Sequence, residues 1–406
     1  MVAGAVTASV EDGSATLYNP AGLARVSHTT IDVSASAYGL RFYHVPGFLR
    51  SVTGDQESAS VTEFVAIPTE IVFVRPLGAG YTLGLGYFVP KAENVILRDR
   101  LSVPAGDDDL ASVWALDIRS NDTNYWLVAA LGIQLSERVS LGIGLNGVYD
   151  NTVSASTLFG GTSRMSMDEQ AFQLSALRTA IRLSASISVG VQVDLGHGLR
   201  AGIGLRGPRL QLYRSDSTSV STVLASLAEQ DAPLLSFFTD EGDDAGDQVG
   251  WFTAGRYRAG FAYRFGDTEV SLEGDMQPGL RNPDLQVARS FTWNVRAGVV
   301  HEAWEDVFIG GGFFSDRATA RDKSDSQDFY GATLGVQFDD LFRLARGERA
   351  PDLLLSSVFA LRYAYGSGKT GTLVVDPQEN LANLGESPGT LRVHEIGLHV
   401  GSALQF

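Results

Sequence analysis

The sequence has no cysteine and no long apolar run, although 44% of its 406 residues are hydrophobic. The first absence excludes disulfides and thiolate metal sites, and the second excludes a transmembrane helix, which needs about 18 or more consecutive apolar residues. Charged residues are also few, at 19%, against roughly 25% in ordinary soluble domains. A chain this apolar must distribute its apolar side chains singly, and alternation along β-strands does so.

Acidic residues outnumber basic ones by 47 to 31, which gives a net charge of -16. Nucleic-acid binding needs clustered Lys and Arg to neutralise phosphates, so we expect no nucleic acid as a partner. The six histidines are scattered, and the sequence contains neither a GxSxG nor an HExxH motif. His394 and His399 fall on opposite faces of an extended chain. We therefore expect no catalytic residues, no metal site and no cofactor.

Segments with a two-residue repeat recur from residue 30 to the end of the chain. In 139–149, for example, Val139 and Leu141 share one face of an extended chain, and Ser140 and Gly142 share the other. The repeat predicts fourteen strands. They are 30–42, 61–75, 80–90, 123–135, 139–154, 179–195, 199–212, 251–265, 268–277, 291–302, 305–314, 327–340, 352–366 and 391–406.

Alternating strands fit either a soluble β-sandwich or a transmembrane β-barrel. Sandwich strands have about five to six residues, whereas strands of about ten cross a bilayer at a tilt. The expected connections alternate in length: 76–79, 136–138, 196–198, 266–267 and 303–304 are short, and 91–122, 157–178, 213–250, 278–290 and 367–390 are long. Short periplasmic turns and long extracellular loops are typical of membrane barrels. We therefore predict an all-β fold, a closed antiparallel transmembrane β-barrel of about 14 strands.

The two ends of the chain support this prediction. The last strand places Ile396, Leu398 and the terminal Phe406 on one face, which resembles the C-terminal signal of outer-membrane barrels. Met1 is followed by neither a basic region nor a sustained apolar core, so we interpret the chain as a form whose signal peptide has been removed. An even strand number starts 1–29 in the periplasm. We expect this segment to fold into the barrel mouth as a hatch, ahead of a barrel formed by 30–406.

One motif lies directly before the first strand: residues 10–26 read VEDGSATLYNPAGLARV. Asn19 followed by Pro20 initiates a turn, Pro20 fixes its own φ, and Gly22 permits a tight reversal. The small side chain of Ala21 allows close packing of the backbone. The four residues NPAG taken alone would fit an ordinary turn.

The longer string resembles the FadL/TodX family of outer-membrane channels for long-chain fatty acids and aromatic hydrocarbons. In that family an acidic run with small residues precedes YNPAGL in an N-terminal hatch. A second match, AIPTEIVFVRPLGAGYTLGLGYFVP at 66–90, resembles the family's second strand, turn and third strand. The resemblance lies in the motifs at 10–26 and 66–90 and is architectural elsewhere, because fourteen strands with a hatch are the family's plan.

The resemblance implies capture of ligand at extracellular loops, a pocket inside the barrel, release past the hatch, and a sideways opening at the third strand. The hatch or gating residues would be Asn19, Pro20, Ala21 and Gly22. The strand 3 opening would involve Gly84, Gly86, Phe88 and Pro90. Glycine within a strand often marks a bulge or kink. The alternative is that these glycines only make room in a crowded lumen.

The segment 213–250 offers an apolar cluster for capture. Val220, Val223, Leu224 and Leu227 have helical spacing. The capture residues would be Leu224, Leu227, Leu234, Leu235, Phe237 and Phe238, because an exposed apolar patch often marks a binding site. The alternative is a helix that packs over the barrel mouth. Arg206, Arg256 and Arg258 face the lumen, either paired with lumen acids or in contact with a ligand carboxylate.

These observations predict a channel in the outer membrane of a Gram-negative bacterium for passive uptake of hydrophobic small molecules, such as long-chain fatty acids or aromatic hydrocarbons. Two other functions stay open: a FadL-like barrel that serves as a secretion or assembly partner, and a general porin filled with water. The expected partners are the hydrophobic ligand, outer-membrane lipid and lipopolysaccharide. We expect a monomer.

Overall fold

The structure is a computed structural model, which describes residues 2–52, 54–104, 110–164, 169–227, 234–246, 249–285, 287–319, 326–341, 353–375 and 384–406. Two short helices precede the strands. They are the α-helix α1 (Ala15–Tyr18) and the 3-10 helix η1 (Pro20–Arg25). No helix in these ranges is long and apolar enough to span a membrane.

Strands make up almost all of the remaining chain. They are β1 (Thr30–Ser51), β2 (Gln56–Gly78), β3 (Tyr81–Val103), β4 (Leu110–Gln134), β5 (Val139–Arg164), β6 (Glu169–Gly196), β7 (Leu199–Arg206), β8 (Arg209–Leu227), β9 (Leu234–Gly246), β10 (Gly250–Thr253), β11 (Arg256–Phe265), β12 (Thr268–Gln277), β13 (Leu280–Asn282), β14 (Val287–Arg289), β15 (Thr292–Trp304), β16 (Val307–Asp316), β17 (Ser326–Phe338), β18 (Leu354–Val375) and β19 (Leu384–Gln405).

The strands form a closed barrel in which sequential neighbours pair antiparallel and β19 pairs with β1. β7 and β8 both pair with β6 and form one interrupted strand, and β9, β10 and β11 form another. Counted in this way, the described residues contain fourteen strands around the ring. Phe406 N donates to Thr29 O over 3.0 Å, so the chain ends beside the start of β1. The predicted all-β fold with a closed antiparallel barrel of about 14 strands is confirmed, and the hatch stays a prediction.

The outer face of the barrel is apolar because it faces lipid. Leu127, Leu145, Ile187 and Phe313 are between 56% and 72% exposed, which is unfavourable in water but not in hydrocarbon. A row of aromatic side chains bounds this region, since the ring centroids of Tyr87 and Tyr125 and those of Tyr125 and Tyr149 lie 6.2 and 6.0 Å apart. Aromatic rows of this kind are typical of the interface between lipid and water.

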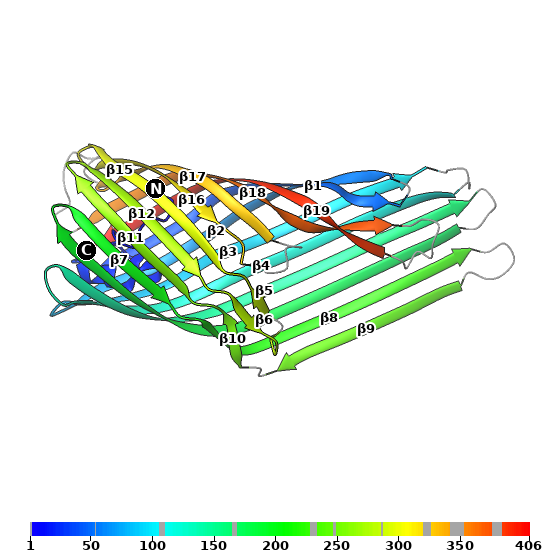
Figure 1. The fold of residues 1–406 in the computed structure, drawn as a ribbon, viewed down its shortest axis with the longest axis horizontal. Coiled ribbons are helices and arrows are strands. Elements are labelled where there is room, and N and C mark those ends of the chain that lie inside the picture. The colour runs from blue at the N-terminus through cyan, green and yellow to red at the C-terminus, as the bar shows by residue number, and fades with distance from the viewer. Residues whose placement is uncertain are drawn as a thin grey trace.

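The strands are much longer than the sequence predicts, and this corrects most of the expected long loops. β5 has 26 residues and β6 has 28, so 157–178 is largely the far ends of two paired strands. The same holds for 91–122, 213–250 and 367–390. Beyond the lipid a strand needs no apolar outer face, so the alternation fades while the ladder continues. Figure 1 shows these extensions of β4, β5, β6, β8 and β9 beyond the shorter strands β11, β12, β15 and β16.

The alternative of a helix packed over the barrel mouth is wrong for 220–227. This stretch is the end of β8, paired on one side with β6 and on the other with β9. The apolar residues do have helical spacing, but the segment also contains the β-branched residues Val220, Thr222 and Val223, which favour strands. Two other features differ from expectation. The connection 278–290 contains the small antiparallel pair β13 and β14, and the far end of β1 pairs in parallel with β18 at Leu49 and Leu373.

Topology can be tested with single cysteines, because the chain has none of its own. Gly242 in β9 pairs with Thr218 in the half of β8 away from the short turns, Glu137 lies in the turn before β5, and both are exposed. We expect an impermeant maleimide on intact cells to label Gly242→Cys and not Glu137→Cys, because the short turns face the periplasm. Both variants should label equally in broken cells. Labelling of the turn variant from outside would overturn the orientation.

Candidate functional site

The N-terminal segment 2–29 lies against the inner wall of the barrel. Glycines that face inward let it approach closely, because a Cβ on each of them would overlap atoms of the segment. These glycines come from strands around the barrel and are Gly84, Gly132, Gly142, Gly190, Gly202, Gly298 and Gly312. Several of the overlapping atoms belong to the backbone, which cannot turn aside as a long side chain can. Segment and wall therefore fit each other with almost no spare volume.

The motif predicted for the hatch forms the centre of this contact. Asn19 is fully buried and donates through Nδ2 to Thr7 O over 2.7 Å and to Val191 O over 3.3 Å. It also caps η1, whose first residue is Pro20. A Cβ on Gly22 would overlap Val10 O. The motif thus ties two parts of the segment to each other and to β6, but its role in gating stays a prediction.

Side chains of the barrel satisfy polar backbone groups of the segment. A carboxylate oxygen of Glu273 accepts from Val6 N over 3.1 Å and from Thr7 N over 2.9 Å. Gln192 donates through Nε2 to Thr7 O and Val10 O over 3.2 and 3.1 Å. Irregular backbone at membrane depth is tolerated only where the protein supplies such partners. These two side chains carry much of the attachment, and the sequence analysis missed both of them.

The structure brings Arg206, Arg256 and Arg258 together beside the same segment. Arg206 donates to Leu17 O over 2.8 Å, and the guanidinium of Arg258 lies 5.1 Å from the centre of the Tyr18 ring. Arg256 pairs with Asp275 over 2.7 Å. These contacts occupy several of their donors within the protein. Contact of the three arginines with a ligand carboxylate stays a prediction.

The lower part of β3 packs against the N-terminal segment. Phe88 is 1% exposed and belongs to an apolar cluster with Leu23, Trp126 and Val148. A Cβ on Gly86 would overlap the Phe88 ring, so this glycine makes room for the ring. Gly84 instead makes room for Thr16 and Leu23. Both glycines therefore make room for neighbouring side chains in a crowded lumen, which was the alternative to a kink.

A bulge follows directly and includes Pro90. The pairing of β3 with β4 shifts between Phe88 and Lys91, so that β3 carries one extra residue. Up to Phe88 the buried residues of β3 are even-numbered, and after the bulge they are odd-numbered, as at Leu97 and Leu101. An extra residue moves every following side chain to the other face. The structure thus has a bulge in β3 just beyond Gly86, and the role of Gly84, Gly86, Phe88 and Pro90 in an opening stays a prediction.

The wall of the barrel separates at this bulge. In the described residues β2 pairs with β3 only from Glu70 opposite Phe88 down to the turn. Above that level β2 continues along β1, and β3 continues along β4. The two strands thus run on without a shared ladder. We call this separation the β2–β3 opening.

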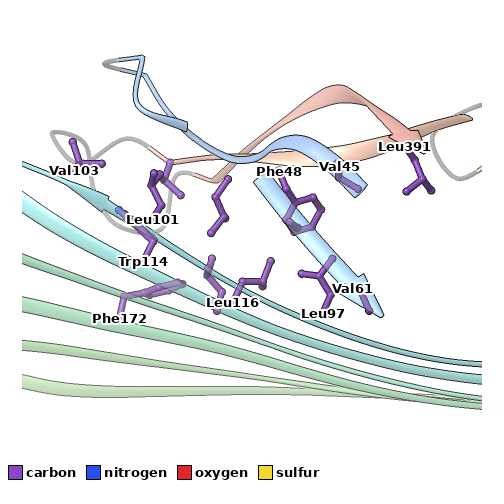
Figure 2. Packing of buried hydrophobic residues seen from close by; sticks show 14 of the residues in the cluster. Val45, Phe48, Val61, Leu97, Leu101, Val103, Trp114, Leu116, Phe172 and Leu391 are labelled. Atoms are coloured by element: carbon purple, nitrogen blue, oxygen red, sulfur yellow. The ribbon is translucent and has the colours of Figure 1, made fainter. Parts of the chain in front are cut away.

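Beside the opening lies a cavity of about 530 Å³ with an apolar lining. Val61 of β2 and Leu97 of β3 reach it from the two sides of the opening, and Leu116 and Leu158 reach it from β4 and β5. Figure 2 shows Val45, Phe48 and Val61 facing Leu97 and Leu116. Many of these positions lie in segments that the sequence analysis took for loops. The bulge also changes which residues of β3 point inward, from even-numbered to odd-numbered, so the lining residues of β3 could not be read from a regular alternation.

Charged groups border the cavity on its periplasmic side. Glu63 is 3% exposed and accepts from Tyr43 Oη over 3.0 Å, and Arg41 pairs with Glu395 over 2.9 Å. Lys91 pairs with Asp122 over 2.6 Å. In the part of the chain that the structure describes, no charged side chain lines the cavity itself. An apolar chamber thus lies above a layer of ion pairs.

The residues predicted for ligand capture lie within two paired strands. Leu224 and Leu227 belong to β8, and Leu234, Leu235, Phe237 and Phe238 belong to β9. β8 and β9 are paired here, with Leu235 opposite Ala225. The orientation of the six side chains lies outside what the structure describes. Their role in capture stays a prediction.

These features define a class of protein, a closed transmembrane β-barrel with its own N-terminal segment folded inside. No family model matches the chain, and no curated protein matches it by sequence. Solved structures do share its fold. A FadL homologue from Pseudomonas aeruginosa superposes with a TM-score of 0.60 at 11% identity, covering 99% of this chain and 97% of that one.

Two further structures are similar over almost their whole length. The toluene transporter TodX of Pseudomonas putida has a TM-score of 0.57 at 12% identity and covers 97% of this chain and 94% of its own. The toluene transporter TbuX of Ralstonia pickettii has a TM-score of 0.53 at 12% identity, with coverages of 100% and 97%. These likenesses confirm the resemblance to the FadL/TodX channels at the level of the fold.

The attachment of the N-terminal segment predicts the effect of Asn19→Ala. Losing a buried hydrogen-bonded side chain costs roughly 1–3 kcal/mol, which loosens a small segment but not the whole barrel. Amide hydrogen exchange in peptides from 2–29 should therefore accelerate about tenfold or more, while exchange in β5 and β6 stays unchanged. Asn282→Ala is the control, because Asn282 is bonded to Trp251 O in an exposed hairpin. Unchanged exchange in 2–29 would contradict the anchoring role.

Proposed function

We propose that the protein is an outer-membrane channel for passive uptake of hydrophobic small molecules. The observation that carries the proposal is the apolar cavity of about 530 Å³ beside the β2–β3 opening. Ligand pockets usually have volumes of about 300–1,000 Å³ and mostly apolar linings. Water in contact with an apolar lining of this size is unfavourable. A hydrophobic molecule that fills the cavity removes this cost.

Within this class the cavity favours uncharged ligands. Its polar contributions come from uncharged groups such as Tyr43, Ser156 and Gln327. A carboxylate placed there would lose its hydration without gaining a cation, which is costly. We therefore propose an aromatic or aliphatic hydrocarbon as substrate in preference to a long-chain fatty acid. The structures named above as toluene transporters are consistent with this choice.

The layer of ion pairs below the cavity directs the proposed route. An apolar molecule that continued down the lumen would have to cross the groups around Arg41 and Lys91, and then the close-packed N-terminal segment. The β2–β3 opening offers a shorter path that begins near Tyr87 of the aromatic row. Ligand then enters the cavity from outside and leaves sideways into the lipid, while the segment 2–29 serves as the hatch that seals the lumen.

The N-terminal segment and the apolar cavity favour this function over a general porin and over a secretion or assembly partner. A general porin needs a lumen filled with water, and the inward glycines instead bring the N-terminal segment against the wall. A secretion or assembly partner would need a surface for other proteins and would have no use for an apolar cavity inside the barrel. Neither alternative accounts for the lining of the cavity. The protein should act as a monomer surrounded by outer-membrane lipid and lipopolysaccharide.

Two neighbouring residues of β3 test the cavity. Val95 lines it, and Ile96 points away with 45% exposure. An amide placed in an apolar site without a partner costs roughly 1–3 kcal/mol, so Val95→Gln should weaken binding of radiolabelled toluene by about tenfold. Ile96→Gln should bind as the unaltered protein does. Equal binding by both variants would show that the cavity is not the site.

A reversible cross-link tests the exit. Cysteines at Val61 and Leu97 face each other across the β2–β3 opening, and a bifunctional thiosulfonate that joins them should slow toluene uptake until a reductant is added. The control joins cysteines at Leu116 and Leu158, which are direct partners in the intact ladder of β4 and β5. This pair places the same reagent in the cavity without bridging the opening. An equal loss of uptake with both pairs would contradict lateral exit.

A further inference from the structure

A second pocket, of about 300 Å³, lies against the inner face of β6 and β8. Three of its arginines come from these strands, namely Arg178, Arg182 and Arg214, and a fourth, Arg289, comes from the hairpin β13–β14. Phe252 lines the same pocket, and the guanidinium of Arg182 lies 3.7 Å from the centre of its ring. The pocket is thus almost entirely polar, unlike the hydrocarbon cavity.

The positive charge in this pocket exceeds the negative charge. Arg178 and Arg214 share a single carboxylate, and each donates to Asp216 over 2.6 Å. Arg209, which also faces Phe252 at 5.3 Å, pairs with Asp150. Five guanidinium groups thus lie in or beside the pocket, and among the described residues the carboxylates paired with them are these two, which hold three of the five. Three positive charges are left over, in a protein whose net charge is -16.

Two of the arginines have no acidic partner. Arg182 donates to the amide oxygen of Gln211 over 2.9 Å. The side chain of Arg289 makes neither a hydrogen bond nor an ion pair within the described ranges, and its guanidinium lies 6.0 Å from the centre of the Phe252 ring. Burial, and then the charge of Arg209, lower the pKa of Arg289 below its ordinary value. The buried Nε of Arg214 also lacks an acceptor. Several donors therefore converge on the pocket without acceptors.

We propose that this pocket binds a small tetrahedral oxyanion of the phosphate and sulfate class. Guanidinium groups form charge-assisted hydrogen bonds with such oxygens. Arginines that approach from two strands and a hairpin suit an anion with acceptors on all sides better than a planar carboxylate with only two oxygens. The occupant would tie β13–β14 to the wall formed by β6 and β8. The proposal does not depend on hydrocarbon transport, because the apolar cavity has its own lining.

The test measures binding of radiolabelled sulfate to the full chain in lipid nanodiscs, by equilibrium dialysis at constant ionic strength. Arg182→Gln and Arg289→Gln should each weaken binding about tenfold or more, since each removes a charged hydrogen-bond donor. Arg264→Gln is the matched control, because Arg264 is exposed near the short turn after β11. Retention of the heat-resistant barrel band on gels shows that each variant is folded.

A gain of binding provides the independent arm. Asp216→Asn removes the carboxylate that occupies Arg178 and Arg214, so sulfate should bind several-fold more tightly. The hydrogen bonds from Arg178 and Arg214 lower the pKa of Asp216 to about 2, so it competes as an anion at neutral pH. Phosphate should displace the label, and acetate should not. Absence of saturable sulfate binding, equal binding by all variants, or binding of laurate in place of sulfate would each overturn the proposal.

Discussion

Backbone polar groups inside a bilayer have no water to bond to, and the rest of this structure follows from that constraint. It closes the sheet, because an open edge would leave a row of unpaired groups in lipid. It also decides how the lumen can be filled. The segment 2–29 is irregular, so the wall must supply its partners, and Glu273 and Gln192 do so. Glycines on the facing strands then bring segment and wall into contact.

One extra residue in β3 has effects at three levels. Locally it shifts the ladder between Phe88 and Lys91. Because side chains alternate, it then turns the odd-numbered apolar residues inward and so supplies part of the cavity lining. At the level of the barrel, β2 and β3 separate where the shift occurs. Cavity and opening therefore have a common origin, which explains why they lie side by side.

The barrel could be predicted from the sequence because lipid imposes a strict alternation on every membrane-spanning strand, as at 139–149. The extensions of the strands beyond the lipid could not be predicted, because nothing there requires an apolar outer face. The segment 157–178 therefore lacks a clear alternation and was interpreted as a loop. Val220 and Leu224 had helical spacing by coincidence, in a segment that pairing with β6 holds extended. The cavity could not be predicted for another reason. A bulge of one residue in β3 changes which side chains point inward without any change in composition. Arg182 and Arg289 come together only through the fold.

The position of the hatch segment in the chain has a consequence for biogenesis. Residues 2–29 precede every strand of the barrel in the chain, yet their contacts extend to Gly298 of β15 and Gly312 of β16, about three hundred positions later. Contacts between residues so distant in sequence form slowly, because a long loop must close first. The segment therefore docks only after the wall has assembled around it. Until it docks, the inward-facing glycines of these strands have no segment to pack against.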